Sequence, residues 1–314
     1  MTQPRRLHGV IPPMITPFDP HGGVDRATLT RLVDRLVASG VHGLFPLGST
    51  GEVAYLTDRQ RQEVCEVVVQ ATAGRVPVIV GCIDLSAPRV IEQARMAQRA
   101  GADGVVATTP IYAINDATET ADHFRAIRAA VDLPLIAYDV PVRSHARVPI
   151  EVVMQLAEEG VLAGIKDSSG DDIGFRRLLR ANRAAGSPLA LLSGHELMCD
   201  AMLMAGADGL VPGLSNVDPS GYVRLYQAAQ QGDWGQAAFE QDRLADLFEI
   251  VFAASGRSAD ARGVGAFKAA MVVLGLLPSA AMAAPVTALD AEHQEAVRQI
   301  VVSWQAKASV DSAV

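Results

Sequence analysis

One lysine stands where the sequence predicts a buried strand. The apolar run LAGIK, residues 162 to 166, ends at Lys166 and continues as DSSGD. Burying an ammonium ion costs several kcal/mol unless it is paired or loses its proton. In one interpretation the amine extends to solvent or pairs with Asp167, Glu196 or another carboxylate. In the other it is a nucleophile whose pKa falls from about 10.4 toward roughly 7 to 8, so that the neutral amine can attack a carbonyl.

A nucleophilic amine also needs a proton carrier and a group that holds an anionic substrate. Tyr138 closes another apolar run, LPLIAY, and its phenol could carry the proton, although a buried tyrosine often only binds backbone. Ser49 and Thr50 offer two adjacent hydroxyls in the segment GSTGE. The glycines on either side, Gly48 and Gly51, let backbone N–H groups approach a carboxylate closely. The alternative for this segment is an ordinary turn between a strand and a helix.

Short apolar runs recur along the chain and are separated by longer amphipathic segments. The runs are continuous rather than alternating, which is typical of parallel strands covered on both faces. Eight successive strand and helix units predict an α/β fold, the TIM (β/α)8 barrel. The pentapeptide AGADG, at 100–104 and 205–209, marks equivalent helix ends with a glycine cap. The predicted strands are 8–14, 41–48, 76–81, 103–108, 133–138, 162–166, 189–193 and 208–213.

The barrel pattern ends before the chain does. We expect residues 1–232 to form the barrel catalytic domain, with its last helix in PSGYVRLYQAAQQGD, and residues 233–314 to form a C-terminal helical extension. Two segments, SGRSADARG at 255–263 and LPSAAMAAPVTALD at 277–290, are expected to interrupt its helices. The extension would pack on the barrel or make a subunit contact.

Composition excludes several classes of function. The net charge of −8 and the 5% aromatic content disfavour nucleic acid as a partner. The three cysteines are isolated, and HELMC is not HExxH, so we expect neither disulfides nor a metal site, which favours a cytoplasmic protein. No apolar segment is long enough for a membrane span. The start, MTQPRRLHGVIPPM, has an apolar run broken by two prolines, so no signal peptide is expected.

In a TIM barrel the chemistry lies at the carboxyl ends of the strands, where these unusual residues fall. The segments GSTGE, TPIY, YDVP and GIKDSSGD, in this order, resemble the motifs of the dihydrodipicolinate synthase and N-acetylneuraminate lyase superfamily. The similarity extends from GVIPPMITPF to FKAAMVVLGL. The resemblance implies a class I pyruvate-dependent lyase on a TIM barrel with a C-terminal helical extension.

The resemblance also implies roles for individual residues. Lys166 would form a Schiff base with a 2-oxo acid such as pyruvate, and Tyr138 would move protons with Ser49 as relay. Thr50 matches the carboxylate site. Tyr112 matches a second family tyrosine that reaches the neighbouring subunit's site in tetrameric members, which implies a homotetramer built as a dimer of dimers.

The second substrate would be bound by residues where the sequence is less typical of the family. Arg143 matches the arginine that binds the second substrate's carboxylate, but the surrounding YDVPVRSH differs from the synthase pattern YNVPSRTG at Asp139, Val142 and His145. Glu196, with His195, follows the seventh predicted strand, where lyases that bind a polyol tail carry acidic residues. The implied substrate-binding residues besides Thr50 are Gly48, Gly51, Arg143, Gly194, His195, Glu196, Pro212 and Gly213.

The expected function is therefore a Schiff-base lyase that condenses or cleaves pyruvate and an aldehyde through a lysine imine, without a cofactor. The same first steps would serve a 2-keto-3-deoxy sugar-acid aldolase or a dehydratase. A barrel isomerase or aldolase that binds phosphate on the loops after the last two strands is a further alternative. The alternative of another class is a catalytically silent protein that binds a 2-oxo acid.

Overall fold

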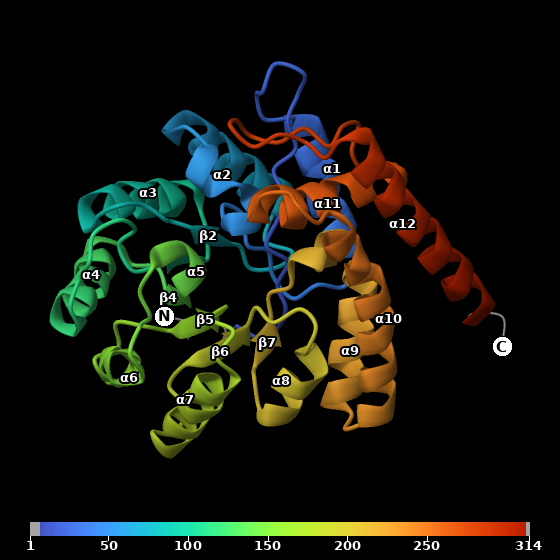
Figure 1. Cartoon of the computed structure of the whole chain (residues 1–314). Coiled ribbons are helices and arrows are strands. Elements are labelled where there is room, and N and C mark those ends of the chain that lie inside the picture. The colour runs from blue at the N-terminus through green and yellow to red at the C-terminus, as the bar shows by residue number, and fades with distance from the viewer. Residues whose placement is uncertain (1–6, 312–314) are drawn as a thin grey trace.

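Parallel strands form the centre of the molecule (Figure 1). The structure is a computed structural model that describes residues 7–311, with side chains described as far as residue 307. The strand order in the sheet is β1-β7-β6-β5-β4-β3-β2, and every neighbouring pair is parallel. The strands are β1 (Gly9–Val10), β2 (Ile79–Gly81), β3 (Gly104–Ala107), β4 (Leu135–Asp139), β5 (Gly164–Asp167), β6 (Ala190–Ser193) and β7 (Gly209–Leu210).

The predicted second strand, 41–48, closes the barrel without forming a regular strand. Isolated parallel bridges join Phe45 to Pro13 on one side and Leu44 to Val78 on the other. Prolines in this region, including Pro46 and the neighbouring Pro12, have no N–H to donate, which limits a continuous ladder. The segment nevertheless lies between β1 and β2, so the predicted (β/α)8 arrangement is confirmed while the regular strand is not.

Helices surround these strands on the outside (Figure 1). Capping residues set their starts: Thr57 and Gln60 form a capping box at one helix, and Asp116 and Glu119 form another. The barrel helices are α1 (Arg26–Ala38), α2 (Asp58–Thr72), α3 (Ala87–Ala100), α4 (Ala117–Ala130), α5 (Pro141–Ser144), α6 (Ile150–Glu158), α7 (Asp172–Ala184), α8 (Cys199–Ala205) and α9 (Pro219–Gln230). Three 3-10 turns complete the loops: η1 (Ser49–Gly51), η2 (Val53–Tyr55) and η3 (Gly213–Asn216).

The two copies of AGADG end helices as predicted. Gly101 ends α3 and Gly206 ends α8, both with positive φ angles that favour glycine, and each is followed by a buried strand. Each unit thus brings the next strand back into the barrel.

Three helices make up the C-terminal part, α10 (Trp234–Ala253), α11 (Ala259–Val273) and α12 (Ala291–Asp311). Helix α10 packs against α9, α11 and α12. The three C-terminal helices α10, α11 and α12 lie on one side of the barrel (Figure 1). The expected interruption at 255–263 is partly wrong, because the Ser258 hydroxyl accepts the N–H of Ala261 and starts α11 inside that segment. The helix consequently carries Asp260 in its first turn.

A buried ion pair ties this extension to the GSTGE segment. Lys268 of α11 binds Glu52 and donates to the Ala281 carbonyl at 2.7 Å, while Glu52 also accepts the N–H of Ala283 at 2.7 Å. Both side chains are almost fully buried. Removing one partner of such a pair leaves an uncompensated charge, so the contact holds the segment in place rather than leaving it free to move.

The three cysteines, Cys65, Cys82 and Cys199, are free and buried. Burial raises the pKa of each thiol, to about 12 for Cys65. No helix within residues 7–311 is long and apolar enough to cross a membrane. The two arginines near the start of the chain lie outside the described residues.

Candidate active site

Lys166 and Tyr138 face each other across neighbouring strands. They are register partners in β5 and β4, so their side chains point to the same side of the sheet. The Lys166 amine lies 4.1 Å from the centre of the Tyr138 ring and 5.1 Å from that of Phe45. Both Lys166 and Tyr138 are buried. The amine therefore does not extend to solvent but lies among aromatic rings.

The carboxylates predicted as alternative partners of Lys166 bind other groups. Asp167 accepts the Ser169 hydroxyl at 2.7 Å and lies 4.0 Å from Arg147. Glu196 accepts the N–H of Leu214 at 2.6 Å. Among the described residues Lys166 forms no ion pair with Asp167 or Glu196, although its charge acts to lower the pKa of Glu196.

The Tyr138 hydroxyl is surrounded by groups that favour loss of its proton. Its oxygen lies 3.5 Å from the Ser49 hydroxyl, and it also has hydrogen bonds with Lys166 and Ser168. Burial alone would raise the pKa of Tyr138, but the charge of Lys166 and these hydrogen bonds outweigh it and lower the pKa below its ordinary value. A phenol in this setting can give up and recover a proton beside the amine.

The GSTGE segment forms a tight turn at the carboxyl end of the segment 41–48, which closes the barrel. A side chain at Gly48 would place its Cβ 2.9 Å from the Phe45 ring, so only glycine fits there. The Thr16 hydroxyl donates to the Gly51 carbonyl at 2.8 Å and fixes the turn from β1's side. Ser49 and Thr50 are half-buried within it, with Ser49 toward Tyr138.

The ends of β6 and β7 complete the mouth of the barrel. A Cβ at Gly194 would lie 2.1 Å from the Ser168 hydroxyl, and one at Gly213 would lie 2.7 Å from Phe267. Pro212 precedes the turn η3. Close packing against Ser168 and Phe267 therefore favours glycine at positions 194 and 213.

Glu196 has an unusual environment at this mouth. Burial raises the pKa of its carboxyl to about 7, although the N–H groups of Leu214 and Gly213 and the charge of Lys166 act in the opposite direction. The carboxyl group thus gains and loses its proton near neutral pH.

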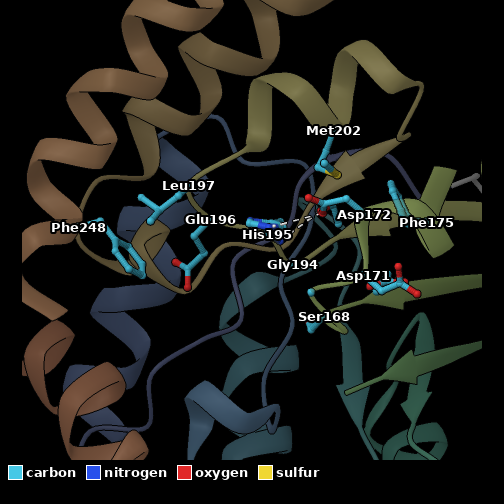
Figure 2. Close-up of a pocket in the computed structure, with 13 residues that line it drawn as sticks. Ser168, Asp171, Asp172, Phe175, Gly194, His195, Glu196, Leu197, Met202 and Phe248 are labelled. Atoms are coloured by element: carbon cyan, nitrogen blue, oxygen red, sulfur yellow. Dashed lines mark hydrogen bonds and ion pairs between the residues drawn. The ribbon is translucent and has the colours of Figure 1, made fainter. Parts of the chain in front are cut away.

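A cavity of ≈ 280 Å³ opens beside these residues. Figure 2 shows Glu196 and Phe248 on one side of it, Asp171, Asp172 and Phe175 on the other, and His195 between them. Nε2 of His195 lies 3.6 Å from Asp172. The lining residues are Asp167, Ser168, Gly170, Asp171, Asp172, Phe175, Ser193, Gly194, His195, Glu196, Leu197, Met202 and Phe248.

Arg143 is placed at the mouth by α5, but its guanidinium is already occupied. Nη1 donates to Oδ2 of Asp260 at 3.0 Å, and Nη2 binds Oδ1 of the same carboxylate. The Tyr55 hydroxyl donates to Oδ2 as well. Sequence reasoning missed Asp260 and Tyr55 because Asp260 was assigned to a loop and Tyr55 carries no motif.

Tyr112 and His145 do not join the other residues. Tyr112 is 90% exposed and has a positive φ of 78°, and His145 is exposed at the end of α5. Among the described residues, Tyr112 has no hydrogen bond, ion pair or ring contact with Lys166, Tyr138 or Ser49.

The atypical Asp139 has a structural role. It is buried, accepts Nε of Arg147 at 2.6 Å and accepts the N–H of Val148 at 3.2 Å. Burial raises the pKa of Asp139 even though Arg147 acts to lower it. The departure from the synthase pattern at this position thus comes with a compensating arginine four residues after Arg143.

Comparison with known proteins matches the fold and these motifs. The model of the Dihydrodipicolinate synthetase family matches residues 6–303. The chain belongs to this family. It is 36% identical, over 79% of this chain and 83% of the relative, to 4-hydroxy-tetrahydrodipicolinate synthase of Phenylobacterium zucineum. It is 37% identical, over 78% of this chain and 79% of the relative, to an uncharacterized DapA-like lyase of Halobacterium salinarum.

A solved structure agrees with the arrangement of the barrel. YagE from E. coli K12, a prophage protein of the dihydrodipicolinic acid synthase family in complex with pyruvate, superposes with a TM-score of 0.89. The two chains are 27% identical, and the match covers 95% of this chain and 99% of YagE. The TIM barrel and the family resemblance are both confirmed, and at this level the comparisons support an enzyme of the lyase class.

Within this dihydrodipicolinate synthetase family member, Glu196 offers a test of the site's electrostatics. Its folded pKa of about 7 lies above the ordinary 4.5, so the native state binds a proton that the unfolded chain has released between these values. Protonated Glu196 therefore makes its full contribution to the free energy of unfolding below pH 4.5, and this contribution is lost as pH rises through about 7. Glu196→Gln keeps an oxygen for the Leu214 N–H but does not ionise.

We therefore expect Glu196→Gln to become more stable than the wild type as pH rises from 5 to 8. The difference in unfolding free energy should reach roughly 1 to 2 kcal/mol at pH 8, since solvent screens the partly exposed side chain. Denaturant unfolding at several pH values measures it. A difference that stays constant with pH would contradict a raised pKa at Glu196.

Proposed function

We propose that this chain is a Schiff-base lyase that condenses or cleaves pyruvate, or a related 2-oxo acid, and an aldehyde through an imine on Lys166. The observation that carries the proposal is the buried Lys166 amine against Tyr138, whose hydroxyl reaches Ser49. YagE, which shares the fold, binds pyruvate according to its own description. No cofactor is needed, because the iminium itself accepts electrons.

The proposed reaction begins at the amine. The neutral amine of Lys166 adds to the keto carbon of the 2-oxo acid, and loss of water gives the iminium. Removal of a proton from C3 gives an enamine, whose C3 forms a bond to the aldehyde carbon while the aldehyde oxygen takes up a proton. Water then hydrolyses the imine, which releases the 2-oxo acid product and restores Lys166. Cleavage follows the same steps in reverse.

Other residues would support these steps. Tyr138, with its lowered pKa and its contact with Ser49, carries protons to and from the carbinolamine and the aldehyde oxygen. Ser49, Thr50 and nearby backbone N–H groups hold the carboxylate of the 2-oxo acid, within the turn that Gly48 and Gly51 allow.

The proposal extends to the assembly. The chain forms a cytoplasmic homotetramer, a dimer of dimers, in which exposed Tyr112 reaches the site of a neighbouring subunit. Its 90% exposure and strained backbone in the single chain support this role.

A second candidate reaction uses the same imine. A 2-keto-3-deoxy sugar-acid aldolase or dehydratase is favoured by the acidic cavity beside Glu196, which has carboxylates suited to substrate hydroxyls. A silent 2-oxo acid binder would share the cavity but would form no covalent adduct.

Borohydride trapping tests the proposal. Incubation with pyruvate and sodium borohydride should reduce the imine and leave a stable adduct, which peptide mass spectrometry should locate on Lys166. The reaction without pyruvate is the control. Absence of an adduct with pyruvate and with other 2-oxo acids would overturn the Schiff-base function and favour the silent binder.

A further inference from the structure

The pair Arg143–Asp260 determines what the site can offer to a second substrate. Both Nη atoms of Arg143 bind the carboxylate of Asp260 in a bidentate geometry. A free guanidinium could bind a substrate carboxylate in the same way. Asp260 is 8% exposed and is also held by the Tyr55 hydroxyl. Hydrogen bonds from Arg143 and Tyr55 overcome burial and lower the pKa of Asp260, so it stays charged and cancels the charge of Arg143.

The other arginine near the mouth is neutralised in the same way. Arg147 donates to Asp139 at 2.6 Å and to Asp171 at 3.1 Å, and it lies 4.0 Å from Asp167. Three carboxylates thus share one guanidinium. The loop after β4 therefore supplies no uncompensated positive charge.

The cavity that follows the ends of β5 and β6, from Asp167 and Ser168 to Glu196, adds negative charge. Asp167, Asp171 and Asp172 line it, together with Glu196, whose pKa of about 7 leaves it partly ionised at neutral pH, and neither lysine nor arginine is among its described lining residues. An anionic tail placed there would be repelled, whereas hydroxyl groups can donate to these oxygens. A cavity of ≈ 280 Å³ holds several water-sized groups, which is enough for a short hydroxylated chain.

We propose that Asp260 is a positioning residue for substrate choice: by occupying the guanidinium of Arg143, it selects an uncharged, hydroxylated aldehyde over one that carries a carboxylate. This inference rests on the proposed Schiff-base function. Asp260 belongs to α11 of the C-terminal extension, so the extension takes part in specificity without touching the reacting atoms.

The test compares two aldehydes of four carbons, D-erythrose and succinic semialdehyde, each with pyruvate. We expect a higher kcat/KM with D-erythrose for the wild type. Asp260→Asn frees the charge of Arg143 at nearly constant shape and should shift the ratio of the two kcat/KM values at least tenfold toward succinic semialdehyde. A merely structural role would lower both values together and leave the ratio unchanged.

Two further variants keep the test decisive. Asp260→Ser removes the same charge by a different side chain, in case the asparagine variant does not fold. Asp246→Asn alters an exposed aspartate that pairs with Lys307 at 2.8 Å, and it should leave the ratio as in the wild type.

The outcomes separate the two levels of inference. A wild type that prefers succinic semialdehyde, or an unchanged ratio in both Asp260 variants, would overturn the role of Asp260 while a pyruvate adduct on Lys166 upholds the Schiff base. Loss of the adduct in the wild type would instead overturn the proposed function itself.

Discussion

Lys166→Ala is expected to remove the borohydride adduct and to lower kcat/KM by about 10⁴-fold or more, because neither Lys268 nor Lys307, the other two lysines of the sequence, is placed to replace the nucleophile. The other buried lysine, Lys268, is bound to Glu52 and to the Ala281 carbonyl. Steady-state kinetics and peptide mass spectrometry measure the two effects. The stability of the variant should equal or exceed that of the wild type, because a buried polar group among aromatic rings is removed.

The matched control is Lys307→Ala, which removes an exposed lysine paired with Asp246. It should keep both the adduct and the activity, since surface ion pairs contribute little. A thermal melt of each variant separates loss of chemistry from loss of fold. An adduct that persists in Lys166→Ala, on any other lysine, would show that the reactive amine had been assigned to the wrong residue.

The sequence predicted most of the barrel because its signals are local. Continuous apolar runs and glycine caps each depend on a few adjacent residues, and seven of the eight runs became strands. The run 41–48 did not become a regular strand. Prolines in three segments, among them Pro13 and Pro77, lack the N–H groups that a continuous ladder would use, and only the folded barrel brings these segments together. A strand prediction based on hydrophobicity does not show which N–H groups the neighbouring strands will lack.

The site was predictable only where a motif marked it. Lys166, Tyr138 and Ser49 were found from their positions at strand ends, and the structure brings them together. Asp260 was missed because its partner, Arg143, is 117 residues away in the chain, and because it follows a segment rich in glycine and serine. A long-range ion pair leaves no periodic signal, so the neutralisation of Arg143 could not be inferred before the fold was known.

Tyr138→Phe is expected to lower kcat by about 10²- to 10⁴-fold, the usual contribution of a positioned proton carrier. The ring that packs against Lys166 remains, so the adduct should still form with pyruvate, only more slowly. The hydroxyl that is lost lies 3.5 Å from Ser49, and its pKa is lowered by Lys166 in spite of burial. Borohydride trapping reactions quenched at several times give the rate of adduct formation, and steady-state assays give kcat.

Tyr222→Phe is the matched control for this change. Tyr222 is also fully buried, but its hydroxyl has no hydrogen-bond partner among the described residues. Removing that hydroxyl should leave kcat unchanged and raise the unfolding free energy by about 1 kcal/mol, because an unsatisfied polar group leaves the core. If Tyr138→Phe behaves like this control, the proton must travel by another group; if only Tyr138→Phe loses activity, its hydroxyl is the carrier and Ser49 its partner.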